Sequence, residues 1–133
     1  MIQIAQAVHD ELVAHALKER PFECCGILAG TTDAVTASYR TANAADLSGI
    51  RYAIDPKEIL QVSRQIDGAD LDMLGVYHSH PFTRAYPSAT DIGQAWEGLV
   101  YVIVSLADFL APDLRAFTVV DGEATEVPVE MTP

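Results

Sequence analysis

Two histidines and an aspartate in the second half of the sequence could share one metal ion. His78 and His80 end an apolar stretch, and Asp91 follows eleven residues after the second histidine. Alternate residues of a strand point to the same face, so both imidazoles of a strand ending there would converge. Catalytic zinc sites use three protein ligands, and two imidazoles with one carboxylate suit that ion. The spacing predicts a Zn²⁺ site at these residues, although iron, cobalt or manganese could also occupy it in vitro.

Each of these residues also has a simpler structural interpretation. A lone pair of histidines at a strand end is more often solvated or hydrogen-bonded than bound to a metal. Ser88-Ala89-Thr90-Asp91 matches a capping box, in which Ser88 caps a helix and Asp91 reaches back to its backbone. We favour the metal interpretation because the histidines, the serine and the aspartate all fall within one short stretch. That combination is rarer than either motif alone.

Glu23 is the candidate for proton transfer at this site. Alone, it would be interpreted as an exposed acid in a short connection, which is the usual situation of a glutamate. Beside a metal, its carboxylate could take a proton from water and return it to the departing amine of a cleaved amide. The working hypothesis is therefore a metal-dependent hydrolase of amide bonds.

The elements that position these residues follow from the apolar pattern and the turn signals. We expect an α/β fold with a mixed, mainly antiparallel sheet flanked by helices, and a hairpin about Asp121-Gly122. The second helix should begin at Asp55-Pro56, stop at Asp67-Gly68 and turn Ile59, Leu60, Ser63 and Ile66 inward. The expected helices span residues 6–18, 56–66 and 88–97, and the expected strands 26–30, 35–40, 71–80, 99–105, 114–120 and 123–129, with a short extended piece at 51–54.

Length and charge limit the remaining possibilities. The 133 residues suit one domain, 1–133, and 8 basic against 19 acidic residues give a net charge of −11, which disfavours nucleic acid and anionic membranes as partners. No apolar run could span a bilayer, and the start of the chain does not resemble a secretory signal, so we expect a cytoplasmic protein. The adjacent Cys24 and Cys25 should be core thiols, and His9 and His15 should face solvent. The oligomeric state stays open.

Glu23, His78-Ser79-His80-Pro81, Ser88 and Asp91 together resemble the JAMM/MPN+ metalloprotease signature, E…H-x-H-P-x6-S-x2-D. The resemblance extends through 23–28, 52–56, 75–77 and 86–88, and so covers most of the chain. It implies the JAMM/MPN fold, a cytidine-deaminase-like architecture, and Zn²⁺ held by His78, His80 and Asp91. It also implies that Glu23 is the general base and acid, and that Ser88 stabilises the oxyanion of the tetrahedral intermediate.

The resemblance implies a substrate class as well. Residues 85–88 and 117–129 are similar to bacterial stand-alone members that release cysteine from a ubiquitin-like sulfur carrier protein. The expected partner is such a carrier, whose flexible Gly-Gly C-terminus would bear the cleaved amide or isopeptide bond. The short connection from Asp91 to Leu99 leaves no room for the insertion with which deubiquitinases hold a second ubiquitin.

Two alternatives stay open and a third is disfavoured. The chain could be a non-catalytic MPN-type scaffold, although such scaffolds usually lack the ligands, or a protease of other ubiquitin-like conjugates. A zinc deaminase is disfavoured because its H-x-E and P-C-x-x-C motifs are absent: the only cysteines, Cys24 and Cys25, are adjacent and precede the histidines.

Overall fold

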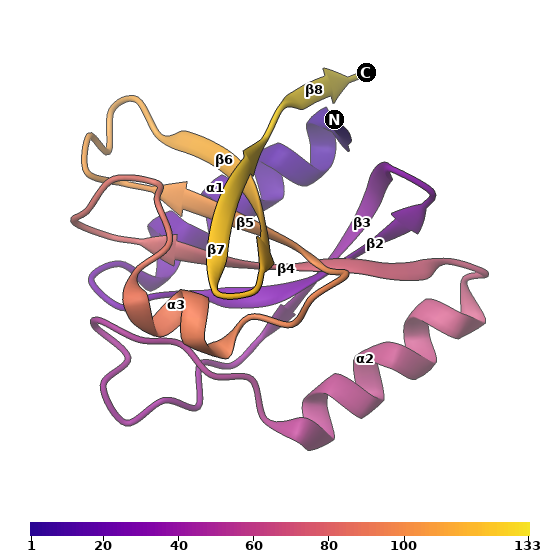
Figure 1. Cartoon of the computed structure of the whole chain (residues 1–133), viewed down its shortest axis with the longest axis horizontal. Helices are drawn as coiled ribbons and strands as arrows, with labels where there is room; N and C mark the ends of the chain where they lie inside the picture. Colours follow the sequence, from indigo (N-terminus) through magenta and orange to yellow (C-terminus); the bar gives the residue numbers. More distant parts are fainter.

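The computed structural model describes residues 1–133, which form one eight-stranded mixed sheet and three helices (Figure 1). The strand order is β7-β6-β5-β4-β2-β3-β1-β8. The strands are β1 (Ile2–Ala5), β2 (Cys25–Thr31), β3 (Ala34–Thr41), β4 (Asp72–His80), β5 (Val100–Ser105), β6 (Asp113–Val120), β7 (Glu123–Val127) and β8 (Val129–Thr132). The helices are α1 (Gln6–Glu19), α2 (Pro56–Gly68) and α3 (Ala89–Gln94). The predicted α/β class with a mixed, mainly antiparallel sheet is confirmed.

Strand β4 lies near the middle of the sheet, antiparallel to β2 and parallel to β5. Two parallel strands cannot be joined by a tight turn, so the chain must cross over from the end of β4 to the start of β5. That crossover contains α3. The first turn of α3 lies beside the carboxyl end of β4, because its Asp91 contacts both His78 and His80.

Helices cover both faces of the sheet. On one face, the side chains of Val8, Leu12 and Ala16 from α1 belong to the same buried cluster as Leu28 of β2. On the other face, Val62 and Ile66 of α2 pack with Ile27 and Ala29, the neighbours of Leu28 along β2. The alternation within β2 thus separates two cores, as expected for a strand with both faces buried.

The sheet curls until its two edges nearly meet. β7 and β8 occupy opposite ends of the strand order, yet only Pro128 separates them in sequence. The predicted strand 123–129 is therefore wrong in its last part. Proline has no amide to donate to a ladder, so pairing with β6 ends there, and β8 pairs in parallel with β1. The sequence interpretation also overlooked β1, a short strand whose only signal was the alternation of two isoleucines.

Two smaller predictions need correction. The third helix ends at Gln94, not at residue 97, although Ser88 caps it as predicted. The short extended piece expected at 51–54 joins no strand of the sheet. Helix α2 buries Val62 and Ile66, whereas Ile59 and Leu60 are exposed, because the helix contacts the sheet mainly through its second half.

The predicted hairpin turn is confirmed. Asp121 and Gly122 both have positive φ angles, of 51° and 75°, as a type I′ turn between right-twisted strands requires. None of the three helices combines the length and the apolar character that crossing a membrane requires.

Candidate metal centre

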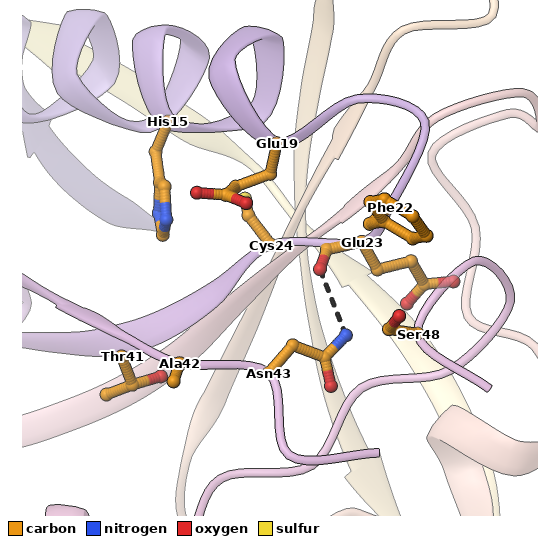
Figure 2. Close-up of a pocket in the computed structure, with 9 residues that line it drawn as sticks. All are labelled: His15, Glu19, Phe22, Glu23, Cys24, Thr41, Ala42, Asn43 and Ser48. Atoms are coloured by element: carbon orange, nitrogen blue, oxygen red, sulfur yellow. Dashed lines mark hydrogen bonds between the residues drawn. The ribbon is translucent and has the colours of Figure 1, made fainter. Parts of the chain in front are cut away.

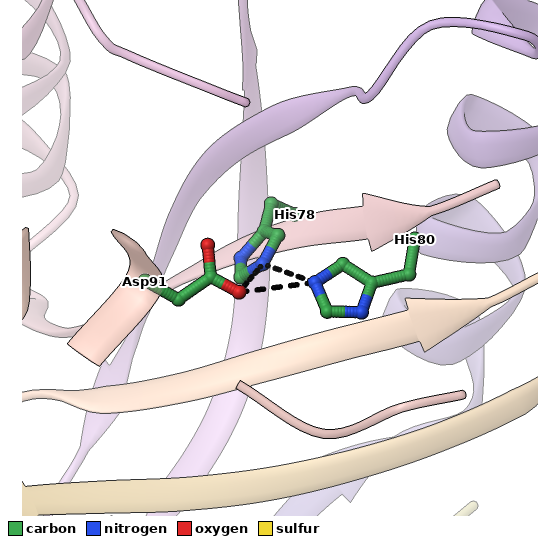
Figure 3. Close-up of side chains that lie close together, drawn as sticks. All are labelled: His78, His80 and Asp91. Carbon is green, nitrogen blue, oxygen red and sulfur yellow. Dashed lines mark hydrogen bonds and ion pairs between the residues drawn. The ribbon is translucent and has the colours of Figure 1, made fainter. Parts of the chain in front are cut away.

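The predicted ligand residues lie together (Figure 3). The Nε2 atoms of His78 and His80 are 3.1 Å apart, and Oδ2 of Asp91 is 3.1 Å from the first and 3.0 Å from the second. All three side chains are buried. One donor atom from each residue thus faces a common point, as ligands of a single metal ion do.

Local sequence explains how the three side chains meet. His78 and His80 are alternate residues at the end of β4, so their side chains share a face of the sheet. Asp91 lies in the first turn of α3, where Ser88 accepts a hydrogen bond from the amide of Asp91 and donates its own amide to the Asp91 carboxylate. This capping box fixes the carboxylate at the helix start, which faces the end of β4.

The donor set fits a divalent cation such as Zn²⁺. Nδ1 of His80 lies 2.9 Å from the carbonyl oxygen of Arg84 and would donate its proton there, which leaves the Nε2 lone pair free for a metal. The orphaned Nδ1 of His78 lies on the other side of the ring from the converging Nε2, so a cation at Nε2 would leave it without a partner. Two neutral imidazoles and a carboxylate satisfy one another only partly, whereas a cation would use all three lone pairs.

Electrostatics favour the ionised form of Asp91 and the neutral form of His78, as a metal needs, whereas His80 holds its proton more tightly than usual and must release it to bind a metal. Burial would raise the pKa of Asp91, but hydrogen bonds from His78 and His80 outweigh burial and hold that pKa far below its usual range. Burial lowers the pKa of His78 and so favours its neutral form. Burial also opposes the charged form of His80, but the hydrogen bond to Asp91 raises its pKa on balance. An ionised aspartate beside a neutral histidine is ready to bind a cation.

Glu23 lies beside this cluster because β2 begins where β4 ends. The amide of Ser79 donates to the carbonyl of Cys24 over 3.1 Å, and the amide of Cys24 donates to Oγ of Ser79 over 2.8 Å. Cys24 is therefore opposite Ser79, and the same antiparallel register places Glu23, the residue before Cys24, opposite His80. Antiparallel partners share a face of the sheet, so both side chains lie on the side of the ligands.

The Glu23 carboxyl group has an environment suited to proton transfer. Its side chain is 6% exposed, and Oε1 is buried without a hydrogen-bond partner. Burial raises its pKa to about 7, with His80 opposing the shift and Asp91 adding to it. Glu23, His80, Phe82 and Ser88 line one cavity of about 220 Å³. A group that titrates near neutrality in such a cavity is a candidate general base and acid.

The loop that follows β3 holds the backbone of Glu23 through two hydrogen bonds. The amide of Glu23 donates to the carbonyl of Ser48 over 2.7 Å. Its own carbonyl accepts from Nδ2 of Asn43 over 3.0 Å, the bond that is dashed in Figure 2. A second cavity of about 280 Å³ lies here, lined by Glu23, Asn43 and Ser48 and by His15 and Glu19 of α1. These contacts fix the peptide that carries the proposed base.

Comparison with known proteins matches this geometry to a family. Residues 5–120 match the model of prokaryotic homologues of the JAB domain. The chain belongs to the JAMM/MPN family. The CysO-cysteine peptidase of Mycobacterium tuberculosis is 41% identical over 123 residues, 90% of this chain and 84% of the relative. The desampylase of Haloferax volcanii is 39% identical over 111 residues, 78% of this chain and 80% of the relative.

Solved structures agree with this family. A solution structure from Desulfitobacterium hafniense superposes with a TM-score of 0.91 at 33% identity and covers 99% of this chain and 93% of that one. A structure described as a JAMM metalloprotease-like zinc site in the proteasome and signalosome has the same fold, with a TM-score of 0.61 at 16% identity over 100% and 99% of the two chains. Because the family model matches most of the chain and the relatives at 41% and 39% identity are named as a peptidase and a desampylase, the chain is a JAMM-type peptidase.

The candidate site contains supporting residues that sequence reasoning missed. The ring of Tyr52 stacks on the imidazole of His78, with centroids 4.2 Å apart and an interplanar angle of 18°. The carbonyl of Arg84 orients His80, and Asn43 holds Glu23. Tyr52 and Asn43 lie in an irregular segment, so no periodic pattern marked them. The second nitrogen of a histidine ligand commonly donates to a carbonyl or carboxylate, and this was the one available signal for the Arg84 contact.

One prediction about other titratable residues is wrong and one is confirmed. His15 does not face solvent: it is buried, and its Nδ1 lies 2.7 Å from the hydroxyl of Tyr77. The helical pattern placed it correctly on α1 but could not show a tyrosine of β4 reaching toward it. Cys24 and Cys25 are free, buried thiols, and burial raises their pKa values to about 12 and about 11. Thiols with such values are poor nucleophiles at neutral pH.

Proposed function

We propose that this chain is a zinc-dependent hydrolase of the amide bond after the C-terminal glycine of a ubiquitin-like sulfur carrier protein, and that it releases cysteine. One observation carries the hydrolytic part. The donor atoms of His78, His80 and Asp91 meet at one point, and Glu23, with a pKa of about 7, lines the same cavity as His80. A JAMM-type amide hydrolase needs this combination of ligands and base.

Each residue would have a distinct role. His78, His80 and Asp91 would hold Zn²⁺, which supplies Lewis acidity toward the scissile carbonyl and activates water. Glu23 would take a proton from the attacking water and transfer it to the departing amine, since its pKa lies near the working pH. Its poor solvation in the cavity means that the carboxylate accepts a proton readily.

Ser88 would stabilise the developing oxyanion. Its hydroxyl oxygen accepts from the amide of Asp91 over 3.0 Å, and the residue lines the cavity together with Glu23. A hydroxyl whose oxygen already accepts a hydrogen bond keeps its own proton free to donate. A donor aimed at developing negative charge can contribute about 3 kcal/mol in a dry site.

The relatives support the substrate class. Proteins 41% and 39% identical to this chain are named CysO-cysteine peptidase and desampylase. The cavity at the site is small, about 220 Å³, and its lining includes Gly49, Ile50, Pro81, Phe82 and Thr83. A Gly-Gly tail has no side chains, so it could enter a narrow space that would exclude bulkier residues.

A direct test is to incubate the purified protein with carrier-cysteine conjugates and to weigh the products by mass spectrometry. We expect a mass loss at the terminal glycine that chelator abolishes and added Zn²⁺ restores. Release that continues in metal-free protein would contradict the zinc mechanism. If the protein instead cleaved carrier-lysine isopeptides and left the carrier-cysteine conjugates intact, the alternative function, a protease of other ubiquitin-like conjugates, would replace this one.

A further inference from the structure

The guanidinium of Arg20 contacts two aromatic rings, one of which, Phe82, lines the cavity of Glu23 and His80. Its Cζ lies 5.2 Å from the ring centroid of Phe82 and 5.3 Å from that of Phe109. Both distances are within the range of cation–π contacts. The rings are themselves 60% and 53% exposed, so this cluster forms a surface feature and is not part of a core.

This arginine has no acidic partner, although the chain carries 19 acidic residues against 8 basic ones. Arg40 pairs with Glu11, and Arg115 pairs with Asp113 and Glu126. No carboxylate comes within ion-pair distance of Arg20. Aromatic rings accept no conventional hydrogen bond from the guanidinium, so its N–H groups are available to bind a carboxylate in a bidentate arrangement.

The cluster lies at the same edge of the sheet as the site. Arg20 follows α1 and precedes Glu23 by three residues, and Phe82 comes two residues after His80. Phe109 belongs to the connection after β5, whose last residue, Ser105, is paired with His80. Phe82 itself lines the cavity that contains Glu23 and His80. The Arg20 guanidinium thus contacts a ring that lines the cavity of Glu23 and His80.

We infer that Arg20 binds the free α-carboxylate of the amino acid that leaves, and so selects conjugates that end in a single amino acid. This inference rests on the proposed function and specifies its substrate class. The carboxylate carbon is two bonds of about 1.5 Å from the scissile nitrogen, so it stays close to the cavity when the amide is positioned for attack. An isopeptide to a lysine side chain has no carboxylate at that distance.

The test uses three substrates with the zinc-loaded enzyme. They are the carrier joined to cysteine, the carrier joined to cysteinamide, and the carrier joined to the Nε of a lysine within a peptide. We expect wild-type kcat/KM to be at least about tenfold higher for the acid than for the amide, as for a charge-assisted hydrogen bond. Arg20→Ala should remove this preference through a higher KM for the acid alone, and leave the other two substrates unchanged.

Two further variants separate recognition from packing. Arg20→Met keeps the apolar stem against the rings but lacks the donors, so it should behave as Arg20→Ala does. Arg64→Ala on α2 removes an exposed cation away from the cavity and should keep the wild-type preference. If Arg20→Ala lowered kcat/KM equally for all three substrates, or if the wild type did not distinguish acid from amide, the role of Arg20 would be refuted. The proposed hydrolase function would not be affected by either result. A wild type that cleaves neither cysteine conjugate would instead refute the cysteine-releasing function, and this inference with it.

Discussion

Oδ2 of Asp91 accepts a hydrogen bond from the amide of Ser88 over 2.9 Å, and the same atom lies within 3.1 Å of both histidine Nε2 atoms. Capping and metal binding are therefore compatible uses of one carboxylate. The capping box holds the side chain in one rotamer, and the positive end of α3 stabilises its charge. The motif that supported a purely structural interpretation is the device that orients the candidate ligand.

The first prediction concerns metal binding. The wild-type protein should bind about one equivalent of Zn²⁺, and saturation at about 100 times the dissociation constant should raise its free energy of unfolding by about 2.7 kcal/mol. His80→Ala removes one of three ligands and should lose both effects, whereas Glu23→Gln should keep them. Metal analysis and thermal melting with and without Zn²⁺ would measure this. Equal Zn²⁺ binding by His80→Ala would show that the ligands are wrongly assigned.

Glu23→Gln should lower kcat by about 10²- to 10⁴-fold, the usual contribution of a general base and acid. The amide of glutamine is nearly the same size as the carboxyl group but cannot accept the proton. Steady-state kinetics on a carrier-cysteine conjugate would measure the loss, with His9→Ala on α1 as a control that keeps full activity. Full activity in Glu23→Gln would mean that another residue transfers the proton.

In the metal-free protein, Glu23 should also make stability depend on pH. Its pKa is about 7 in the fold against 4.5 ordinarily, so the folded state binds the proton more tightly. The stabilisation is therefore complete below about pH 4.5 and is lost as the pH rises through about 7, with about 3 kcal/mol as the upper bound of the total change. Asp91 contributes with the opposite sign, because its pKa is lowered in the folded state. Its contribution to stability is fully present above about pH 3.8 and is lost only at more acidic pH.

Urea unfolding of wild type and Glu23→Gln at pH 5 and pH 8, both with chelator, would isolate this effect. Titrations that the two proteins share cancel in the difference between their free energies of unfolding. The variant should gain stability relative to wild type at pH 8 and not at pH 5. A difference that is the same at both pH values would show that Glu23 is already ionised at pH 5.

The cap and hydroxyl roles of Ser88 can be separated with two substitutions. Ser88→Ala removes both the cap and the donor, so it should cost about 1 kcal/mol of stability and about 10²-fold in kcat. Glycine at a cap costs only a few tenths of a kcal/mol relative to serine, so Ser88→Gly should be nearly as stable as wild type but equally slow. If Ser88→Gly has wild-type kcat, the hydroxyl has no catalytic role.

The sequence sufficed for the parts of the site that are local. The spacing of His78 and His80 within a strand, and of Ser88 and Asp91 at a helix start, follows from the backbone geometry of one element each. The position of Glu23 depends on β2 pairing with β4, a contact between residues more than fifty apart. Only the full signature, taken as a resemblance, suggested it.

Other features left no pattern in the sequence. Tyr52 stacks on His78 from an irregular segment, and β8 pairs with β1 across the whole length of the chain. Loops lack the period that reveals a helix or strand, and an edge strand of four residues is too short to show one clearly. The error at Pro128 arose because continuous β-forming residues on both sides masked a change of pairing partner.

The last prediction tests how tightly β4 and β5 must approach to place the histidines. A Cβ on Gly75 would lie 2.1 Å from the carbonyl oxygen of Val100, its partner on β5, so Gly75→Ala must push the strands apart. We expect a loss of about 3 kcal/mol in the free energy of unfolding, as for an overpacked core, together with weaker Zn²⁺ binding, because His78 follows on the same strand. Gly93 of α3 is the matched control: nothing lies within 4 Å of its Cβ position, so Gly93→Ala should stabilise the helix by about 0.5 to 1 kcal/mol. Chemical unfolding and Zn²⁺ titration of both variants would decide, and a Gly75→Ala protein as stable as wild type would mean that the β4–β5 contact is looser than described.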